Sequence, residues 1–342
     1  MGTTGCWLLV FMAAAAWIGR TDGGMVNVCS DLKDCTSCTQ SYVHIFSFRE
    51  HCRWCYSTST CGGPIACPSG SATAQRDPFK CPQKASVAKG RRYTDKLGRS
   101  LYALNLAARQ KNPTACLNAS RPDVKLHKYY EVECDQTGNT CAGMLAVSDE
   151  AKALYVIYKG DSLDKQLFQG GMKEDLGKLK EQHKDYRVWV TGNGLGGSLA
   201  SMTALYLVNQ TIFTSDRVKL VTFGEPRTGN YLFAKAIEAN LNFRYRVIHR
   251  NDALTNIPAS MDPDNLFLSV ASAEKQPYFY RFAVHYDNDM SREGDQFELC
   301  EHPEDHHCRN LAMAVDFNDH LSYFGVKPDD WLKAGCPKSK LL

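Results

Sequence analysis

Long apolar runs, an excess of one charge and internal repeats are all missing from this chain. After residue 23, no stretch approaches the roughly eighteen apolar residues of a membrane-spanning helix. The 40 basic and 37 acidic residues are interspersed and leave a net charge of +3, so a polyanionic partner is not indicated. Aromatic and basic residues form no cluster of the kind that binds nucleic acid. A hydrophobic content of 44% is ample for a folded core, which indicates a globular chain.

The first residues have the pattern of a secretory signal. Residues Cys6 to Gly19 form an apolar run that is too short for a comfortable transmembrane helix. The alanines from Ala13 to Ala16 offer small residues for cleavage. We expect residues 1–23 to be a signal peptide, with an uncleaved anchor as the alternative.

Cysteine is abundant, with 15 residues, and its number indicates an oxidising compartment. Cys6 falls in the expected signal, and the even number that remains fits a set of disulfides in an exported chain. Asn118 and Asn209 begin Asn-x-Ser/Thr sequons, which are glycosylation acceptors in secreted proteins. The sequence therefore predicts a secreted, extracellular glycoprotein with disulfide bonds.

Cysteine density also divides the chain. Many of the cysteines fall between Cys29 and Cys81, in a segment that buries too little apolar surface to fold without cross-links. The Cys-x-x-Cys spacings that begin at Cys35 and Cys52 mimic zinc knuckles, but an oxidising compartment favours disulfides over that alternative. We predict a cysteine-rich module over residues 24–83, a basic, solvated linker over residues 84–100 and a larger domain over residues 101–342.

Helical and strand patterns alternate within that larger domain. Strands are expected over residues 144–148, 154–159, 218–223 and 245–249, and helices over residues 163–183, 195–208 and 231–239. A Gly170-Gly171 pair is expected to break the first of these helices. Strands separated by helices predict an α/β fold with a mostly parallel central sheet covered on both faces.

The most informative segment runs from Val188 to Ala200. A β-branched and aromatic strand leads into a glycine-dense turn, and a helix rich in Ala, Leu and Met follows. In this context a G-x-S-x-G elbow presents a nucleophilic serine at its apex. Here residues Gly192 to Gly196 read Gly-Asn-Gly-Leu-Gly, so Gly194 stands at the apex. Glycine has no side chain and cannot attack a carbonyl.

Three further motifs follow the elbow along the chain. They are Val-Thr-Phe-Gly-Glu-Pro-Arg-Thr-Gly-Asn over residues 221–230, His-Arg-Asn-Asp over 249–252 and Asp-His-Leu-Ser-Tyr-Phe-Gly over 319–325. With the elbow, they resemble the class 3, or fungal-type, triacylglycerol lipases, which are α/β-hydrolases, from about Leu97 to Cys336. The resemblance implies that Asp252 is the triad acid and His320 the base, which in a working triad removes the serine proton.

The oxyanion hole that the resemblance implies is altered as well. Family members usually carry a hydroxyl residue where this chain has Asp161, and a carboxylate there would oppose the developing negative charge. The backbone N–H groups of Asp161 and Leu195 remain possible donors. Loss of one such donor typically costs about 10² to 10³ in turnover. Ser162, Ser198 and Thr191 are the nearby hydroxyl residues, and none is expected at the apex.

The resemblance also implies three disulfides in the larger domain: Cys116 with Cys336, Cys134 with Cys141, and Cys300 with Cys308. The N-terminal module, with its Trp54-Cys55 pair, resembles plexin-semaphorin-integrin (PSI) modules. A histidine and carboxylate group spanning residues 301–307 could suggest a metal site, but a solvated loop is the better interpretation. We expect no metal and no cofactor.

Three functional hypotheses follow from these features. The leading one is a secreted, non-catalytic lipase homologue that binds a lipid, an acyl ester or a protein partner through the former active-site cleft. The first alternative is a residual lipase or esterase in extracellular lipid metabolism. The second is an adhesive or receptor-binding protein that acts through the PSI-like module.

Overall fold

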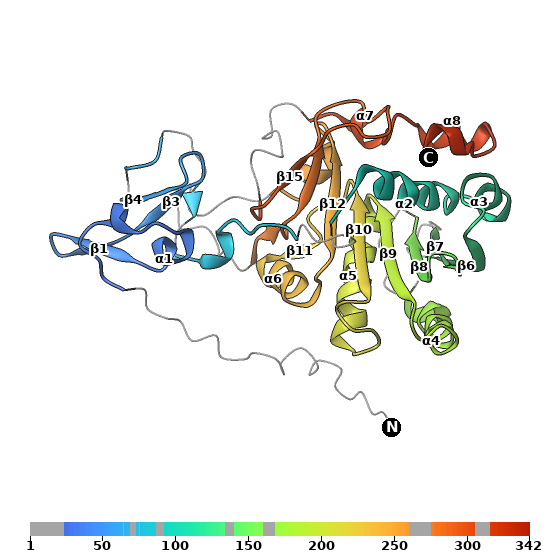
Figure 1. Ribbon diagram of the computed structural model, residues 1–342, viewed down its shortest axis with the longest axis horizontal. Helices are drawn as coiled ribbons and strands as arrows, with labels where there is room; N and C mark the ends of the chain where they lie inside the picture. Colours follow the sequence, from blue (N-terminus) through green and yellow to red (C-terminus); the bar gives the residue numbers. More distant parts are fainter. Residues whose placement is uncertain are drawn as a thin grey trace, which may run out of the picture. The chain divides into compact units, whose positions relative to one another are not determined.

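The computed structural model describes residues 24–63, 65–68, 73–74, 76–86, 92–133, 140–159, 168–259, 275–304 and 315–342. The expected signal peptide, residues 1–23, lies outside this part of the chain. Contacts divide the chain into two units, Met1–Cys81 and Pro82–Leu342 (Figure 1). Within the described ranges, no helix combines the length and the apolar character needed to cross a membrane.

The first unit is a small module that is held together by disulfides. Its elements are η1 (Cys29–Asp31), α1 (Cys35–Thr39), the hairpin β1 (Tyr42–Ile45) and β2 (Phe48–His51), the sheet β4 (Thr60–Gly62), β3 (Arg53–Cys55) and β5 (Thr73–Ala74), and η2 (Pro78–Lys80). The disulfides are Cys29–Cys52, Cys35–Cys81, Cys38–Cys61 and Cys55–Cys67. Each cysteine of the two Cys-x-x-Cys pairs forms a disulfide with a cysteine outside its own pair, so the zinc alternative is wrong.

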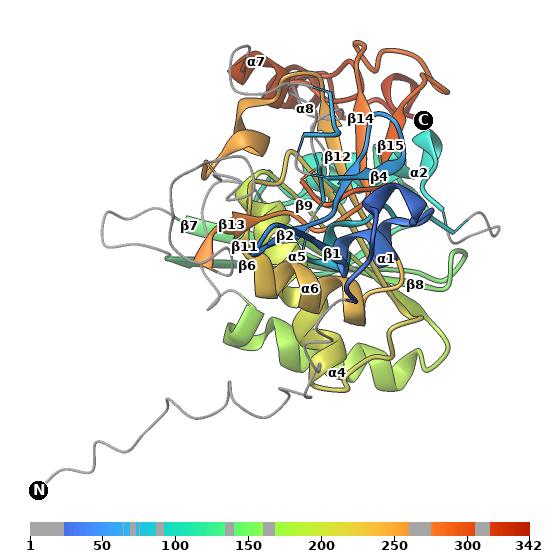
Figure 2. The ribbon, with the colours of Figure 1, turned by 90° about the vertical axis from the view of Figure 1, so that its left-hand side faces the viewer.

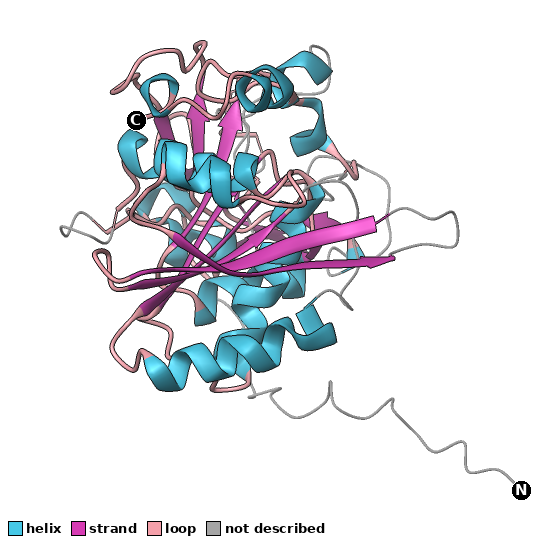
Figure 3. Cartoon of the chain, turned by 90° about the vertical axis from the view of Figure 1, so that its right-hand side faces the viewer, coloured by secondary structure: helices cyan, strands magenta, loops and turns pink. Residues whose placement is uncertain are grey.

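The second unit is built on an eight-stranded sheet in the order β15-β14-β12-β10-β9-β8-β7-β6. The strands are β6 (Lys125–Glu133), β7 (Thr140–Ser148), β8 (Ala153–Tyr158), β9 (Arg187–Asn193), β10 (Val218–Phe223), β12 (Arg244–His249), β14 (Ala283–Tyr286) and β15 (Glu298–Cys300). Strands β8 to β14 are parallel, and the pairs at both edges are antiparallel. The predicted α/β fold with a mostly parallel sheet is confirmed (Figure 3).

Helices cover both faces of this sheet (Figures 1 and 3). The helices of this unit are α2 (Asp95–Ala107), α3 (Thr114–Ser120), α4 (Lys173–Gln182), α5 (Leu195–Asn209), α6 (Tyr231–Asn240), α7 (Phe317–His320) and α8 (Pro328–Lys333). Short pieces complete the unit: the π-helical turn η3 (Phe168–Met172), η4 (Ala253–Asn256), η6 (Lys338–Lys340) and the pair β11 (Gly229–Asn230) with β13 (Pro277–Tyr278). The predicted glycine break at residues 170–171 lies within η3, and residues 160–167 lie outside the described part.

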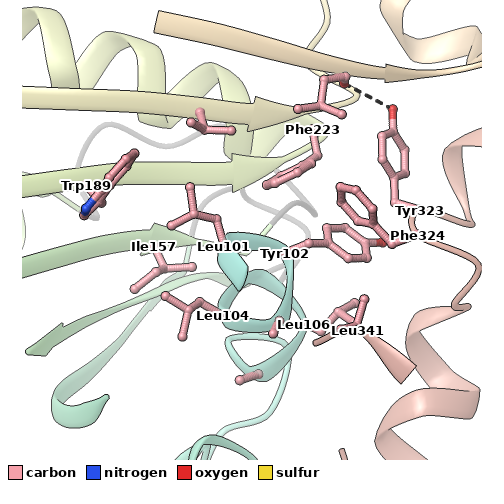
Figure 4. Packing of buried hydrophobic residues seen from close by; sticks show 14 of the residues in the cluster. Leu101, Tyr102, Leu104, Leu106, Ile157, Trp189, Phe223, Tyr323, Phe324 and Leu341 are labelled. Atoms are coloured by element: carbon pink, nitrogen blue, oxygen red, sulfur yellow. Dashed lines mark hydrogen bonds between the residues drawn. The ribbon is translucent and has the colours of Figure 1, made fainter. Parts of the chain in front are cut away.

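An aromatic cluster joins the sheet to the C-terminal segment. Tyr102 of α2 lies 5.1 Å from Phe223 at the end of β10, 5.6 Å from Tyr323 and 5.5 Å from Phe324, measured between ring centroids (Figure 4). All four side chains are buried, and edge-on packing of such rings adds to the stabilisation from burial. The segment that follows α7 is therefore fixed against the sheet.

The expectation of a solvated linker up to residue 100 is wrong for its second half. Helix α2 begins at Asp95, with Thr94 accepting a hydrogen bond from the Leu97 amide at 3.2 Å. Arg99 is buried, donates to the Asp95 carboxylate at 2.7 Å and also donates to the carbonyl oxygens of Met290 and Arg292. Those carbonyls lie about 190 positions further along the chain, so the local charge pattern could not reveal this burial.

We predict that Arg99→Ala lowers the free energy of unfolding by about 3–5 kcal/mol, because it leaves the buried Asp95 carboxylate without its cation. Lys111→Ala is the matched control, since its side chain is 83% exposed in an ion pair with Glu131. That substitution should cost less than about 1 kcal/mol. Denaturant unfolding measures both values, and equal losses would contradict the buried pair.

Candidate functional site

The site is assembled at the carboxyl ends of three adjacent parallel strands. Gly194 follows β9, Gly224 follows β10, and Asp252 lies three residues after the end of β12. The loops at this edge of an α/β sheet are where ligands bind in such folds. His320 reaches the same place from the end of α7.

Gly194 forms a sharp turn between β9 and α5. Its φ is 57° and its ψ −127°, a conformation that residues with a Cβ rarely adopt, and its N–H donates to the Phe223 carbonyl oxygen at 2.8 Å. A Cβ added to Gly194 would lie 3.1 Å from Nε2 of His320 and 3.4 Å from Cδ2 of Leu254. A side chain at position 194 would therefore point at the His320 imidazole.

The Asp252 carboxylate is completely buried and accepts hydrogen bonds from three residues. His320 Nδ1 lies 2.8 Å from Oδ2, the Tyr323 hydroxyl donates to the same oxygen at 2.6 Å, and the Leu254 amide donates to Oδ1 at 2.9 Å. Because Nδ1 is engaged in this way, Nε2 of His320 is left facing Gly194. The structure thus brings together the three residues predicted as apex, acid and base.

Tyr323 is a site residue to which the sequence analysis assigned no role. Burial and the adjacent Asp252 carboxylate raise the pKa of Tyr323 well above its ordinary value, so the phenol stays protonated and donates. The His249 amide donates in turn to the Tyr323 oxygen at 3.3 Å. The only signal in the sequence was the position of Tyr323, three residues after His320.

Gly224 is the second residue without an assigned role in the sequence analysis. Its φ is 57°, and a Cβ at this position would lie 2.6 Å from Oδ2 of Asp252 and 2.7 Å from Nδ1 of His320. Any side chain would therefore displace the pair. Glycine is required here both by the backbone conformation and by the close approach of the two side chains.

Of the two predicted oxyanion-hole positions, Leu195 lies within the described residues and Asp161 does not. Leu195 is the first residue of α5, and its N–H is one of the four at a helix start that have no acceptor inside the helix. The positive end of the helix dipole lies at the same place and favours negative charge near the apex. Asp161 and Ser162 lie outside the described residues, so the predicted effect of Asp161 stays a prediction.

The other hydroxyl residues that the sequence analysis considered lie in buried networks. Ser198 is 1% exposed and accepts a hydrogen bond from Thr228 Oγ1 at 2.9 Å. Thr191 is fully buried and accepts one from Asn105 Nδ2 at 2.9 Å. Neither side chain lies at the apex.

Among the cysteines of this unit, Cys116 and Cys336 form a disulfide. Cys141 and Cys300 are also disulfide-bonded, but their predicted partners, Cys134 and Cys308, lie outside the described residues. Both sequon asparagines, Asn118 and Asn209, are exposed.

The group considered as a metal site is only partly described, since residues 305–314 lie outside. Within the described part, Glu301 accepts a hydrogen bond from Lys84 Nζ at 2.6 Å. Glu304 forms a two-point ion pair with the Arg227 guanidinium, at 2.8 and 2.9 Å. Both carboxylates are therefore engaged with cationic side chains of the chain itself.

A central parallel strand, a strained glycine turn and a helix that starts at the turn define an α/β-hydrolase fold. The comparison with known families agrees, because residues 103–261 match the family model described as Lipase (class 3). Over this part of the chain, the sequence is similar to the class 3 lipase family.

Individual lipases and one solved lipase structure are also similar to this chain. A Caenorhabditis elegans protein named lipase ZK262.3 is 27% identical over 297 residues, covering 72% of this chain and 84% of its own length. The secreted mono- and diacylglycerol lipase 1 of Fusarium solani is 25% identical over 153 residues, covering 45% of this chain and 42% of its own. The solved structure of Rhizomucor miehei triacylglyceride lipase matches with a TM-score of 0.54 at 19% identity, covering 69% of this chain and 97% of that one.

We predict that Tyr323→Phe lowers the free energy of unfolding by about 1–3 kcal/mol, because the buried Asp252 carboxylate loses one donor. Tyr206→Phe is the control, since its hydroxyl accepts a hydrogen bond from Lys173 at an exposed site. Denaturant unfolding of both variants tests this, and a loss no larger than that of the control would mean that Tyr323 does not support Asp252.

Proposed function

We propose that this chain is a non-catalytic lipase homologue that binds a lipid or an acyl ester at the site around Gly194. The observation that carries the proposal is the absence of a hydroxyl at the apex beside an otherwise formed Asp252–His320 pair. In a serine hydrolase, the histidine takes the proton of the apex serine while the carboxylate orients and stabilises the imidazole. Here no atom at the apex can accept an acyl group covalently, and loss of the serine in such an enzyme costs about 10⁶ in turnover.

Apolar side chains beside the site support a lipid as the ligand. Ile257 next to η4 is 51% exposed, and Phe317 and Leu321 at α7 are 66% and 56% exposed. These elements contact each other and carry Leu254 and His320, which face Gly194. Adjacent exposed apolar groups of this kind mark interaction sites, and acyl chains are a ligand that would cover them.

We further propose that the chain is exported. Five disulfides among the described residues fit an oxidising compartment, and one of the relatives is named as a secreted lipase. The expected signal peptide and the two exposed sequon asparagines are consistent with this route.

Restoring the hydroxyl tests the proposal directly. We predict that Gly194→Ser becomes labelled by a fluorophosphonate probe and hydrolyses a short-chain ester at least about 10²-fold faster than the wild type, because the base is already in place. Gly194→Ala is the matched control: it has the same Cβ and the same backbone strain but no oxygen, so it should stay unlabelled. Labelling of any serine in the wild-type chain would refute the non-catalytic assignment.

The alternative is a residual hydrolase, which the names of the relatives favour. His320 is 14% exposed, and its Nε2 could activate a water molecule in place of a serine. Ester hydrolysis by the wild type that disappears in His320→Ala would establish this alternative. Partner binding by residues 24–83 alone, without any lipid binding, would instead favour the adhesive function.

A carboxylate introduced beside the apex tests whether the site binds an acyl chain. We predict that Leu254→Asp weakens binding of a fluorescent fatty acid at least about tenfold, because an acyl chain would meet a carboxylate. Leu232→Asp is the control, since Leu232 is 54% exposed on α6. Fluorescence titration measures both, and equal affinities in the two variants would place the ligand elsewhere.

A further inference from the structure

The β1–β2 hairpin of the cysteine-rich module, drawn in blue (Figures 1 and 2), has an apolar and exposed tip. The hairpin turns through Phe46 and Ser47, with Ile45 paired to Phe48 across the strands. Phe46 is 95% exposed, Phe48 73% and Ile45 43%. Three large apolar side chains within four consecutive residues thus contribute little to the core of this unit.

The backbone adds a second observation. Phe46 has a φ of 56°, at a position in a short hairpin loop where glycine, asparagine or aspartate is favoured. A bulky side chain in this conformation is costly, and an exposed ring recovers nothing through burial within the chain. Backbone strain that no internal contact offsets indicates a function for the side chain that causes it.

The two faces of the hairpin differ in character. Directly paired residues lie on the same face, so Ile45 and Phe48 share one face at the tip. The pairs Tyr42–His51 and His44–Arg49 share the other face. The Arg49 guanidinium lies 3.8 Å from the centre of the Tyr42 ring. Behind the apolar tip, one face therefore carries aromatic rings with the Arg49 guanidinium, and the other carries Val43 and the Glu50 carboxylate.

We propose that this hairpin tip inserts into an anionic lipid surface. The tip pair and the Tyr42–His51 pair are three residues apart, or about 10 Å along a strand. This matches the depth of about 5–10 Å to which interfacial segments enter the boundary of headgroups and acyl chains. Aromatic rings are favoured at that boundary, and arginine attracts anionic headgroups.

A protein partner fits the hairpin less well. A stable protein interface buries about 800 Å² on each side, which is more than three side chains at the tip of one hairpin provide. The lipid contact does not depend on the site around Gly194. It would bring the lipase-like unit to a surface on which its proposed ligands are concentrated.

The test is flotation of the full chain with phosphatidylcholine vesicles, with and without phosphatidylserine. We predict that the wild type binds the anionic vesicles and that Phe46→Gly binds them about tenfold more weakly. Glycine suits the backbone at this position, so the thermal stability of Phe46→Gly should be unchanged or higher. Ile65→Ser is the matched control, because Ile65 is also 95% exposed in the same module but lies outside the hairpin. Its vesicle binding should equal that of the wild type.

Several outcomes would overturn the proposal. They are no vesicle binding by the wild type, equal losses in Phe46→Gly and Ile65→Ser, or a marked loss of stability in Phe46→Gly. Vesicle binding that is lost in Leu254→Asp but kept in Phe46→Gly would assign the lipid contact to the site around Gly194 instead. Because fatty-acid titration tests that site separately, failure of one proposal is distinguishable from failure of the other.

Discussion

The buried Asp252 carboxylate is the constraint on which the rest of the site depends. A buried charge is tolerated only when it is paired and hydrogen-bonded, and Asp252 meets this requirement through His320, Tyr323 and the Leu254 amide. These bonds connect the loop after β12 to the segment around α7, and the absence of a Cβ at Gly224 leaves room for them. The orientation of His320 Nε2 toward the apex is a consequence of this arrangement.

This constraint also explains how a triad-like pair can persist without a serine. The Asp252–His320 bond stabilises the connection between two loops whether or not chemistry takes place at the apex. Tyr323 belongs both to this hydrogen-bond network and to the aromatic cluster around Tyr102, so loosening the pair would disturb the packing of α2 against the sheet. The hydrogen bonds of Asp252, by contrast, form without any hydroxyl at the apex. The proposed binding function and the retained geometry are therefore compatible.

Each unit carries exposed apolar side chains for which its own core has no use. In the lipase-like unit they include Phe317 and Leu321 at α7 and Ile257 beside η4, and in the cysteine-rich module they include the tip of the β1–β2 hairpin. A lipid is a ligand that both sets could share. In the first unit, four disulfides take the place of a large core, which allows a small module to hold a strained, exposed hairpin.

The sequence alone determined the elements whose signal is local. Strand β10 has the predicted bounds, helix α6 differs from its prediction by a single residue, and the glycine turn at Gly194 is visible in the residue pattern itself. Tertiary structure alone decided the burial of Arg99, the role of Tyr323, the need for glycine at Gly224 and the pairing of the module cysteines. Each of these depends on groups that are distant in the chain and meet only in the folded state. Hydrophobic periodicity and turn residues report on neighbours in sequence, whereas satisfaction of a buried charge depends on neighbours in space.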